Sequence, residues 1–421
     1  MPFQLSAEKL VYGGDALGHH QGRTVLVPRA LPGERLEVEE VRTAKGVVHA
    51  RPLRVVAPAP ERVNPPCPFF GRCGGCHYQH FAAENQVVAK REILRETLRR
   101  IGKIGWNSEI HVHASHPWNY RNQAQFKIAR KAGSEVSLGF FEAESHNLCP
   151  IDACMIISPK LNEIFSELRK PEYAAQLAGC SEIEVLADGR DERAMITVHG
   201  DLNAERAASL ARDFLMQLPG VISVACEVGH HWRVAGAPAF EYRVGEFTYR
   251  VSPTSFFQAS RFLLPSLAEA VAAETKGQLA LDLFAGVGLL TLPLARRFGE
   301  VVAVEAHVPA ARDLVANAES HSLGNVHVAA ESAFDFLRRF ARAGPDLVVI
   351  DPPRAGVGAR TLRFIAALRP RRIHYVSCHP PTLARDLSFL VAQGFELSSI
   401  ELFDFFPQTF HIESLAKLTS G

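Results

Sequence analysis

The pattern of hydrophobic and polar positions divides the chain into three regions, and the first covers residues 1–57. Apolar and polar residues alternate there in four short segments, 3–11, 24–27, 35–41 and 47–56. Alternation with a period of two predicts half-buried strands, and the glycines and prolines between the segments predict turns. Short strands at this spacing close most easily into a small β-barrel. Such barrels often bind RNA, although a spacer barrel without a ligand fits the same pattern.

The second region, residues 58–254, mixes helical and strand periodicity. One long amphipathic helix is predicted over 81–101, with apolar residues on one face and basic residues between Lys90 and Lys103 opposite them. Strand pairs are predicted within 119–141 and 240–251, and a helix over 202–218. Together these elements are typical of an α+β domain.

The third region, residues 255–421, repeats strand and helix in turn, which predicts a doubly wound, Rossmann-like α/β sheet. An apolar run at 279–283 predicts a buried strand, and Gly286 and Gly288 lead from it into a helix that begins at Thr291. Glycines at such a turn leave room for a ligand beside the helix N-terminus, although two glycines after a strand also suit a simple turn.

The neighbours of this turn indicate which ligand it favours. A dinucleotide fold needs a third glycine three residues after Gly288, and Thr291 stands there instead. A second predicted strand ends in Glu305, where a carboxylate can accept hydrogen bonds from both hydroxyls of a ribose. This combination favours S-adenosylmethionine over NAD.

Two later strands of this region also end in residues suited to chemistry. One runs into Asp351 and two prolines, and the next runs into Cys378. Ligands of open α/β sheets bind at the carboxyl ends of the strands, so Asp351 is expected in the pocket. Cys378 is either small core filler or a nucleophile, and its position favours the nucleophile. His411 and Glu413, close to the end of the chain, could reach the same edge.

Composition and charge restrict the class of protein further. The 421 residues carry a net charge of +1, which neither predicts nor excludes a nucleic-acid partner, because local clusters of basic residues decide that. No apolar run is long enough to span a membrane, and no signal-peptide pattern opens the chain. We therefore expect a cytoplasmic protein whose cysteines are reduced.

Three of the cysteines, Cys67, Cys73 and Cys76, lie in one short loop that contains two adjacent glycines. Such a loop supplies most of a four-cysteine site, and Cys149 or Cys154 is available as the fourth ligand. Zinc and an iron–sulfur cluster both accept four thiolates. A three-plus-one arrangement leans towards a [4Fe–4S] cluster, because zinc sites more often contain two paired CxxC motifs.

Together these motifs resemble those of the bacterial RNA uracil-C5 methyltransferases, which form 5-methyluridine in large-subunit ribosomal RNA. The likeness covers nearly the whole chain in the right order. The matching pieces are Gly13 to Glu34, which resembles the OB-like TRAM barrel, Cys67 to Cys76, Phe256-Phe257-Gln258, Asp282-Leu-Phe-Ala-Gly-Val-Gly288, Glu305, Asp351-Pro-Pro-Arg354, Ser377-Cys378 with Thr382-Leu-Ala-Arg-Asp386, and Phe406-Pro-Gln-Thr-Phe-His-Ile-Glu413.

The resemblance indicates which cysteine is the fourth cluster ligand, and it also shows where this chain differs from the family's motifs. The family's fourth cluster cysteine precedes a short apolar run and a proline, which Cys154 fits better than Cys149 does. Ala285 and Leu289 replace residues common in relatives without removing an essential role. His379 stands where an asparagine usually follows the nucleophile, so the polar surroundings of the thiolate differ.

The resemblance implies a multidomain α/β protein with three parts. These are a TRAM-like barrel at 1–57, a central α+β iron–sulfur domain at 58–254 and a methyltransferase domain at 255–421, with the helix of 81–103 able to pack on the last. It further implies two bound groups, S-adenosylmethionine and a [4Fe–4S] cluster. The implied cofactor-binding residues are Gln258, Phe284, Gly286, Glu305 and Asp351, and the implied cluster ligands are Cys67, Cys73, Cys76 and Cys154.

The chemistry of the family explains why a thiolate and a carboxylate are needed. Uracil C5 is a poor nucleophile, and addition of a thiolate to C6 turns the ring into an enolate whose C5 attacks the methyl group. Cys378 would supply the thiolate, with a pKa expected to be lowered by positive charge nearby. Glu413 would then remove the C5 proton, with a pKa raised by burial, and His411 would orient it.

RNA is the partner that the resemblance implies, and a stacked base must be extruded before Cys378 can reach it. Candidate contacts are the helix from Lys90 to Lys103, the barrel and the arginines near residue 360. Ribosomal RNA is favoured, with transfer RNA as the alternative. We expect a monomer with no obligate protein partner. A radical enzyme and a non-catalytic RNA-binding protein are opposed by the Cys378 and Glu413 pair and by the intact glycine turn.

Overall fold

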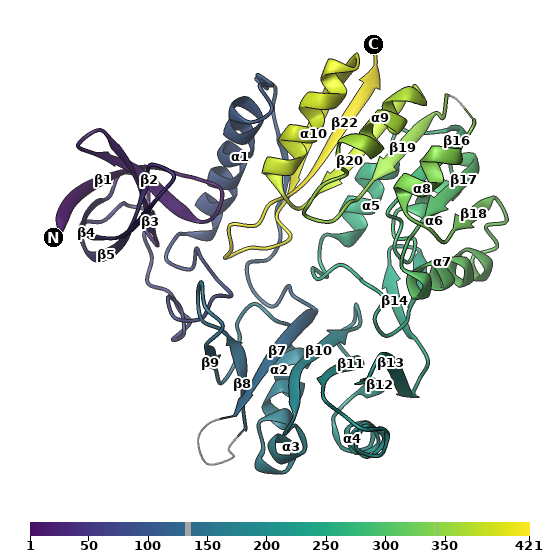
Figure 1. Ribbon diagram of the computed structural model, residues 1–421, viewed down its shortest axis with the longest axis horizontal. Helices are drawn as coiled ribbons and strands as arrows, with labels where there is room; N and C mark the ends of the chain where they lie inside the picture. Colours follow the sequence, from purple (N-terminus) through teal and green to yellow (C-terminus); the bar gives the residue numbers. More distant parts are fainter. Residues whose placement is uncertain (131–135, 343) are drawn as a thin grey trace.

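The structure is a computed structural model and describes residues 1–130, 136–342 and 344–421. Its N-terminal segments form a closed five-stranded barrel (Figure 1). The strands are β1 (Phe3–Leu10), β2 (Asp15–His20), β3 (Arg23–Pro28), β4 (Arg35–Ala44) and β5 (Val47–Ala57). Alternate residues such as Leu5, Val25 and Leu36 fill the interior, which confirms the predicted barrel.

The central lobe is a seven-stranded sheet covered by helices. The sheet order is β13-β12-β11-β10-β7-β8-β9. The strands are β7 (Gln123–Arg130), β8 (Val136–Phe141), β9 (Leu148–Pro150), β10 (Cys180–Ala187), β11 (Ala194–Gly200), β12 (Val221–Val228) and β13 (His231–Gly236). The helices are α2 (Pro159–Leu168), α3 (Pro171–Gln176) and α4 (Ala204–Gln217). Part of the predicted strand pair, residues 131–135, lies outside the described residues.

The C-terminal sheet has eight strands in the order β18-β17-β16-β19-β20-β22-β21-β6. They are β6 (His111–His113), β16 (Gly277–Leu283), β17 (Phe298–Val304), β18 (Val326–Ala329), β19 (Leu347–Ile350), β20 (Arg372–Ser377), β21 (Phe395–Phe403) and β22 (Glu413–Ser420). The five strands from β18 to β20 are parallel, whereas β22 runs antiparallel to β20 and β21.

Successive residues of β16 enter different cores, Ala280 on one face of the sheet and Leu281 on the other. Both faces are therefore covered, as expected for a doubly wound sheet. The helices of this region are α5 (Leu264–Ala272), α6 (Thr291–Ala295), α7 (Val308–Ser320), α8 (Ala333–Arg339), α9 (Ala359–Ala367) and α10 (Pro380–Ala392). Measured on the described residues, every helix falls short of the length or the apolarity that crossing a bilayer requires.

Three segments of the middle region, namely α1, β6 and the β14–β15 hairpin, pack against elements of the C-terminal region. Helix α1 (Ala83–Arg100) packs on α10, and β6 forms an edge of the sheet by pairing with β21. The hairpin of β14 (Phe240–Val244) and β15 (Phe247–Val251) lies on α7, where the Asn317 side chain accepts a hydrogen bond from the Arg250 N–H at 2.6 Å. The chain thus passes between lobes more often than a division into three consecutive domains would require. The predicted domain boundaries at residues 57 and 254 stay a prediction.

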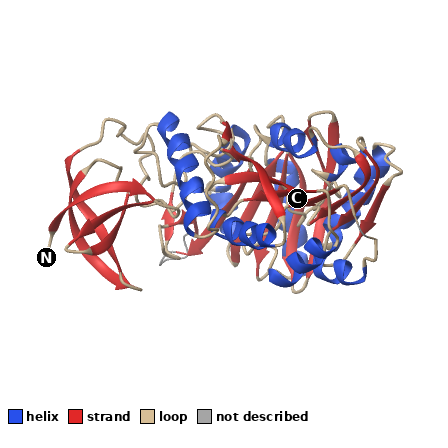
Figure 2. Cartoon of the chain, turned by 90° about the horizontal axis from the view of Figure 1, so that it is seen from above, coloured by secondary structure: helices blue, strands red, loops and turns tan. Residues whose placement is uncertain are grey.

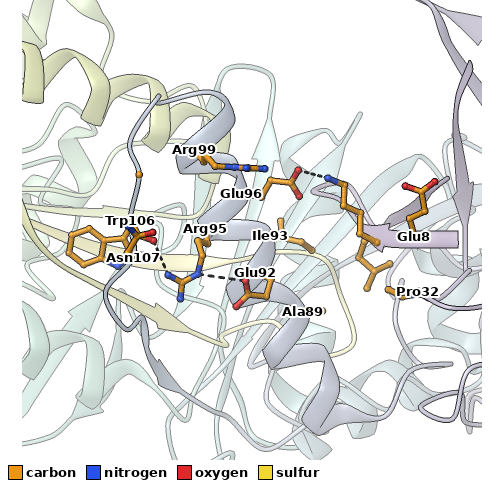
Figure 3. A pocket seen from close by; sticks show the side chains of 13 residues that line it. Glu8, Pro32, Ala89, Glu92, Ile93, Arg95, Glu96, Arg99, Trp106 and Asn107 are labelled. Carbon is orange, nitrogen blue, oxygen red and sulfur yellow. Dashed lines mark hydrogen bonds and ion pairs between the residues drawn. The ribbon is translucent and has the colours of Figure 1, made fainter. Parts of the chain in front are cut away.

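The barrel lies at one end of the molecule, next to α1 (Figure 2). Lys9 of β1 forms an ion pair with Glu96 of α1 at 2.5 Å. This pair spans a groove of about 540 Å³ whose lining includes Arg95, Arg99 and Trp106 (Figure 3). At this groove the barrel therefore faces α1 with side chains of both charges, not with a purely basic surface.

Candidate active site

Four neighbouring parallel strands present their carboxyl ends along one edge of the C-terminal sheet. In the order β17, β16, β19 and β20, these strands are followed by Glu305, Phe284, Asp351 and Cys378. This edge is where open α/β sheets bind ligands. The fold therefore brings together residues that are separated by up to about a hundred positions in the chain.

The glycine turn after β16 holds Glu305 in place. The Gly286 N–H donates to Glu305 Oε2 at 2.8 Å, and the His307 N–H donates to Oε1 at 2.7 Å. Gly286 has a φ of +55°, a left-handed conformation that costs glycine nothing. Each carboxylate oxygen keeps a lone pair for a further donor.

Thr291 has a different role from the third glycine of a dinucleotide fold. Its hydroxyl donates to Asp282 Oδ2 at 2.5 Å inside the fold, where Asp282 is fully buried. Burial raises the pKa of Asp282 to about 7. The bond fastens the start of α6 to the end of β16 and so fixes the shape of the turn between them.

Asp351 and the loop that follows it are also fixed by hydrogen bonds. The Gln258 amide donates to Asp351 Oδ2 at 3.4 Å, and burial raises the pKa of Asp351 to about 7. Asp386 of α10 accepts from the Val357 N–H at 3.0 Å and from the Tyr375 hydroxyl at 2.8 Å. The motif that contains Asp386 thus shapes the loop from Asp351 to Val357.

Cys378 and Glu413 lie next to each other because β20 and β22 pair antiparallel. Ser377 is opposite Ser414 in this ladder, so the next step of the register sets Cys378 against Glu413. Glu413 is only 3% exposed. Burial, and secondly the charge of Asp351, raise the pKa of Glu413 well above its usual range, as expected for a proton acceptor that works near neutrality.

The expectation of a lowered thiol pKa is wrong for Cys378. Burial raises the pKa of this thiol to about 11, and the negative charges of Glu413 and Asp351 add to the effect. Arg354 acts in the opposite direction through its charge and a hydrogen bond to the sulfur, but it does not outweigh them. Arg354 belongs to the motif Asp351-Pro-Pro-Arg354, but the spacing in that motif does not indicate this contact with the sulfur.

Other neighbours of Cys378 are held by local contacts. His379 Nδ1 accepts from the Thr382 N–H at 3.3 Å and caps α10. An asparagine at this position would serve equally well, because asparagine is a preferred N-cap residue. His411 Nδ1 lies 3.4 Å from Arg354 Nη2, and burial lowers the pKa of His411 to about 3.

Helix α1 supports the segment that leads to Glu413. Lys90 is fully buried, and its Nζ donates to Asp404 Oδ1 at 2.7 Å and to the Phe406 carbonyl at 2.9 Å. The Gln86 amide exchanges two hydrogen bonds with Gln408. Lys90 therefore cannot contact RNA. The prediction that Lys90 belongs to a basic face available to RNA is wrong, because its ammonium pairs with the carboxylate of Asp404 inside the protein.

The four cysteines predicted as cluster ligands, Cys67, Cys73, Cys76 and Cys154, line one cavity of about 220 Å³. Cys149 is fully buried and is not among the residues that line it. Within the described ranges, no three His, Cys, Asp or Glu side chains are placed to hold a metal ion. The ligand assignment stays a prediction, although the fold does bring the four thiols together.

Known proteins resemble this chain over different lengths. The family model described as tRNA (Uracil-5-)-methyltransferase matches residues 239–420. The 23S rRNA (uracil(1939)-C(5))-methyltransferase RlmD of Alkalilimnicola ehrlichii is 36% identical over 99% of this chain and 96% of its own. A protein of Aquifex aeolicus named as an uncharacterized RNA methyltransferase is 33% identical over 99% of this chain and 98% of its own.

Among solved structures, the tRNA (uracil-54, C5)-methyltransferase of Pyrococcus abyssi in complex with S-adenosyl-L-homocysteine has a similar fold. It matches with a TM-score of 0.77 and 23% identity, over 99% of this chain and 100% of that one. The whole-length relatives above 30% identity and the matching family model all point to RNA methyltransferases. The protein belongs to the RNA uracil-C5 methyltransferase family and is an enzyme of that class.

Proposed function

We propose that this enzyme methylates C5 of a uridine in 23S ribosomal RNA, with S-adenosylmethionine as donor, Cys378 as nucleophile and Glu413 as proton acceptor. One observation carries the proposal above all others. The pairing of β20 with β22 sets a thiol and a buried carboxyl side by side at the ligand-binding edge of the sheet.

The methyl donor has suitable partners along this edge. Gln258, Phe284, Gly286, Glu305 and Asp351 are the residues proposed to hold it. Glu305 fits a ribose, because each of its oxygens accepts one N–H from the described backbone and can accept a hydroxyl as well. S-adenosylmethionine supplies an electrophilic methyl group when bound, as the S-adenosyl-L-homocysteine in the Pyrococcus abyssi structure suggests.

Cys378 and Glu413 then act in turn on the base. The Cys378 thiolate forms a bond to C6, and the electron pair of the C5–C6 double bond moves towards O4, so that C5 becomes nucleophilic. C5 would take the methyl group as the bond between methyl and sulfonium breaks, with S-adenosylhomocysteine as the leaving group, and Glu413 then accepts the C5 proton. The electron pair of that C–H bond restores the double bond as the bond between sulfur and C6 breaks. Arg354 stabilises the thiolate before addition and after release.

Two variants separate these roles. Cys378→Ala removes the nucleophile and should abolish both methylation and the covalent adduct with 5-fluorouracil RNA. Glu413→Gln should still transfer the methyl group but release the product slowly, so that a covalent complex accumulates even with ordinary RNA. Cys149→Ala, a buried thiol away from the edge, is the matched control. Normal methylation by Cys378→Ala would refute the mechanism.

The RNA target is proposed from the relatives. The 36% identical protein from Alkalilimnicola ehrlichii is named for 23S rRNA, and the match covers both chains almost completely. Transfer RNA is the alternative, since the matching family model is described as a tRNA enzyme. Purified enzyme, labelled donor and separate transcripts of each RNA decide between them. Product in transfer RNA alone would overturn the ribosomal assignment.

We also propose that Cys67, Cys73, Cys76 and Cys154 hold a [4Fe–4S] cluster. The cavity they line is several times larger than the roughly 30 Å³ that one water occupies in the liquid. A single zinc ion needs its sulfurs about 2.3 Å from one centre, whereas a cubane binds each thiolate through a different iron. The Gly75 N–H donates to the Cys73 sulfur at 3.4 Å, a contact that suits a thiolate ligand.

The cluster is tested by metal analysis of anaerobically purified protein. We expect iron and acid-labile sulfide near four of each per chain, with broad absorption in the visible range. Cys73→Ala and Cys154→Ala should lose both signals, and Cys149→Ala should keep them. Zinc without sulfide would contradict the assignment, as would an unchanged iron content in Cys154→Ala.

A further inference from the structure

An aromatic side chain of the barrel, Tyr12, reaches the catalytic edge. Tyr12 lies between β1 and β2, and its ring meets the His379 ring edge-on with centroids 5.2 Å apart. It meets the Phe410 ring in the same manner at 5.4 Å. His379 directly follows Cys378, and Phe410 belongs to the segment that ends in Glu413. Tyr12 therefore packs against the segment that follows Cys378 and the segment that precedes Glu413.

The loop that holds Tyr12 is fixed against this segment. The Val11 N–H donates to the Asp15 carbonyl at 3.0 Å, which closes the loop. Gly14 has a φ of +97°, and a Cβ placed on it would lie 3.2 Å from Phe410 and 3.4 Å from His77. The barrel backbone thus comes so close that only glycine fits comfortably, and Tyr12 is held at a defined place.

The electrostatic surroundings show that Tyr12 shares the environment of the reacting groups. Burial raises the pKa of the Tyr12 phenol to about 12, opposed by the charge of Arg354 and supported by those of Cys378 and Glu413. The phenol is therefore protonated at neutral pH and can donate a hydrogen bond. Among the described residues, no side chain or carbonyl forms a hydrogen bond with this hydroxyl, and the side chain is only half-buried.

We infer that Tyr12 forms one wall of the pocket for the target uracil and that its hydroxyl donates a hydrogen bond to a carbonyl oxygen of that base. The inference rests on the proposed function, and it makes the barrel part of the active site as well as a candidate RNA anchor. A flipped pyrimidine beside Cys378 presents two carbonyl oxygens, and a protonated phenol without a partner is a suitable donor for either.

The competing explanation is that Tyr12 only packs the barrel against the catalytic lobe. Tyr12→Phe distinguishes the two, because it keeps the ring and both edge contacts and removes only the hydroxyl. Phe3→Ala is the matched control for loss of a partly buried barrel aromatic. Phe3 stacks on His20 with ring centroids 4.3 Å apart, and both residues belong to strands of the barrel.

The experiment measures adduct formation with 5-fluorouracil RNA in a single turnover at saturating RNA, together with the RNA dissociation constant. Loss of one hydrogen bond to the base should slow adduct formation by Tyr12→Phe roughly three- to tenfold. RNA affinity should change less than about twofold, since phosphate contacts dominate it. Tyr12→Ala should be slower still, and Phe3→Ala should match the unaltered enzyme.

The outcomes separate this inference from the proposed function. If the unaltered enzyme forms the adduct and Tyr12→Phe forms it at the same rate, the inference is wrong and the proposed function stands. Equal slowing by Tyr12→Phe and Phe3→Ala would also overturn it, because the effect would then come from the barrel as a whole. If the unaltered enzyme forms no adduct, the proposed mechanism itself fails.

Discussion

The buried ion pair between Lys90 and Asp404 should carry a large share of the stability of the catalytic segment, and Asp404→Asn tests this. The Lys90 side chain is 0% exposed and that of Asp404 is 4% exposed, with 2.7 Å between Nζ and Oδ1. Burial lowers the pKa of Lys90 below its usual range, and Asp404 opposes the shift. Removal of the carboxylate charge leaves an ammonium without compensation inside the protein.

The loss of unfolding free energy in Asp404→Asn has an upper limit, because Lys90 can release its proton and become neutral. Neutralising a lysine costs about 1.36 kcal/mol for each pH unit below its reference value of about 10.4, hence about 4.6 kcal/mol at pH 7 and about 1.9 kcal/mol at pH 9. Breaking a buried pair typically costs about 3–5 kcal/mol. In the variant the folded state binds fewer protons than the unfolded state, so its stability rises with pH.

We therefore expect Asp404→Asn to lose about 3–4 kcal/mol of unfolding free energy at pH 7 and clearly less at pH 9. Urea unfolding followed by tryptophan emission is suitable, because Trp106 contacts Arg95 of α1 through its carbonyl at 2.8 Å. Addition of Lys90→Met to the variant should restore most of the loss, since it removes the uncompensated charge.

Arg99→Met is the control on the same helix, because Arg99 is exposed. It should change the unfolding free energy by less than about 0.5 kcal/mol. The reasoning is refuted if Asp404→Asn costs less than about 1 kcal/mol at pH 7. It is also refuted if the loss is the same at pH 7 and pH 9, since proton release by Lys90 would then play no part.

Three further predictions concern methylation, RNA binding and adduct formation. Gly356→Ala should reduce methylation at least tenfold without weakening RNA binding, because φ at Gly356 is +78° and a Cβ there would lie 2.7 Å from Asp386; normal turnover would contradict this. Replacement of the exposed Arg360 and Arg363 by Gln should lower the salt dependence of RNA binding by about one unit of slope each, as measured by titration at several salt concentrations. Adduct formation in the absence of methyl donor should rise about tenfold per pH unit from 6.5 to 8.5, since the pKa of Cys378 is about 11, and a plateau in this range would disprove it.

The ends of the parallel strands were predictable from local sequence patterns. The turn at Gly286, the strand that ends in Asp351 and the strand that ends in Cys378 are all readable from short apolar runs and the residues that interrupt them. Parallel strands share a ligand-binding edge, so this part of the site required no knowledge of long-range contacts.

Features that depend on distant pairing were not predictable in the same way. The burial of Lys90 depends on Asp404, which is 314 positions away, and a basic residue on an amphipathic helix otherwise indicates a solvated face. The three-residue strand β6 is too short to produce a periodic pattern, and only β21 shows where it belongs. The pKa of Cys378 depends on a balance of burial, two carboxyl groups and Arg354, which no motif encodes.

We expect the carboxyl groups of Asp351 and Glu413 to release protons when the methyl donor binds. Near pH 7 Asp351 is half protonated, and burial together with the charge of Asp351 raises the pKa of Glu413 well above its usual range. A sulfonium cation favours ionised carboxyl groups near it, and Glu413 must be ionised to accept a proton from C5. Affinity for S-adenosylmethionine should therefore rise with pH through about 7.

S-adenosylhomocysteine lacks only the methyl group and its positive charge, so its affinity should depend little on pH. Calorimetry in buffers of different ionisation enthalpy measures the protons released, and equal release by the two ligands would show that the carboxyl groups do not respond to the sulfonium charge.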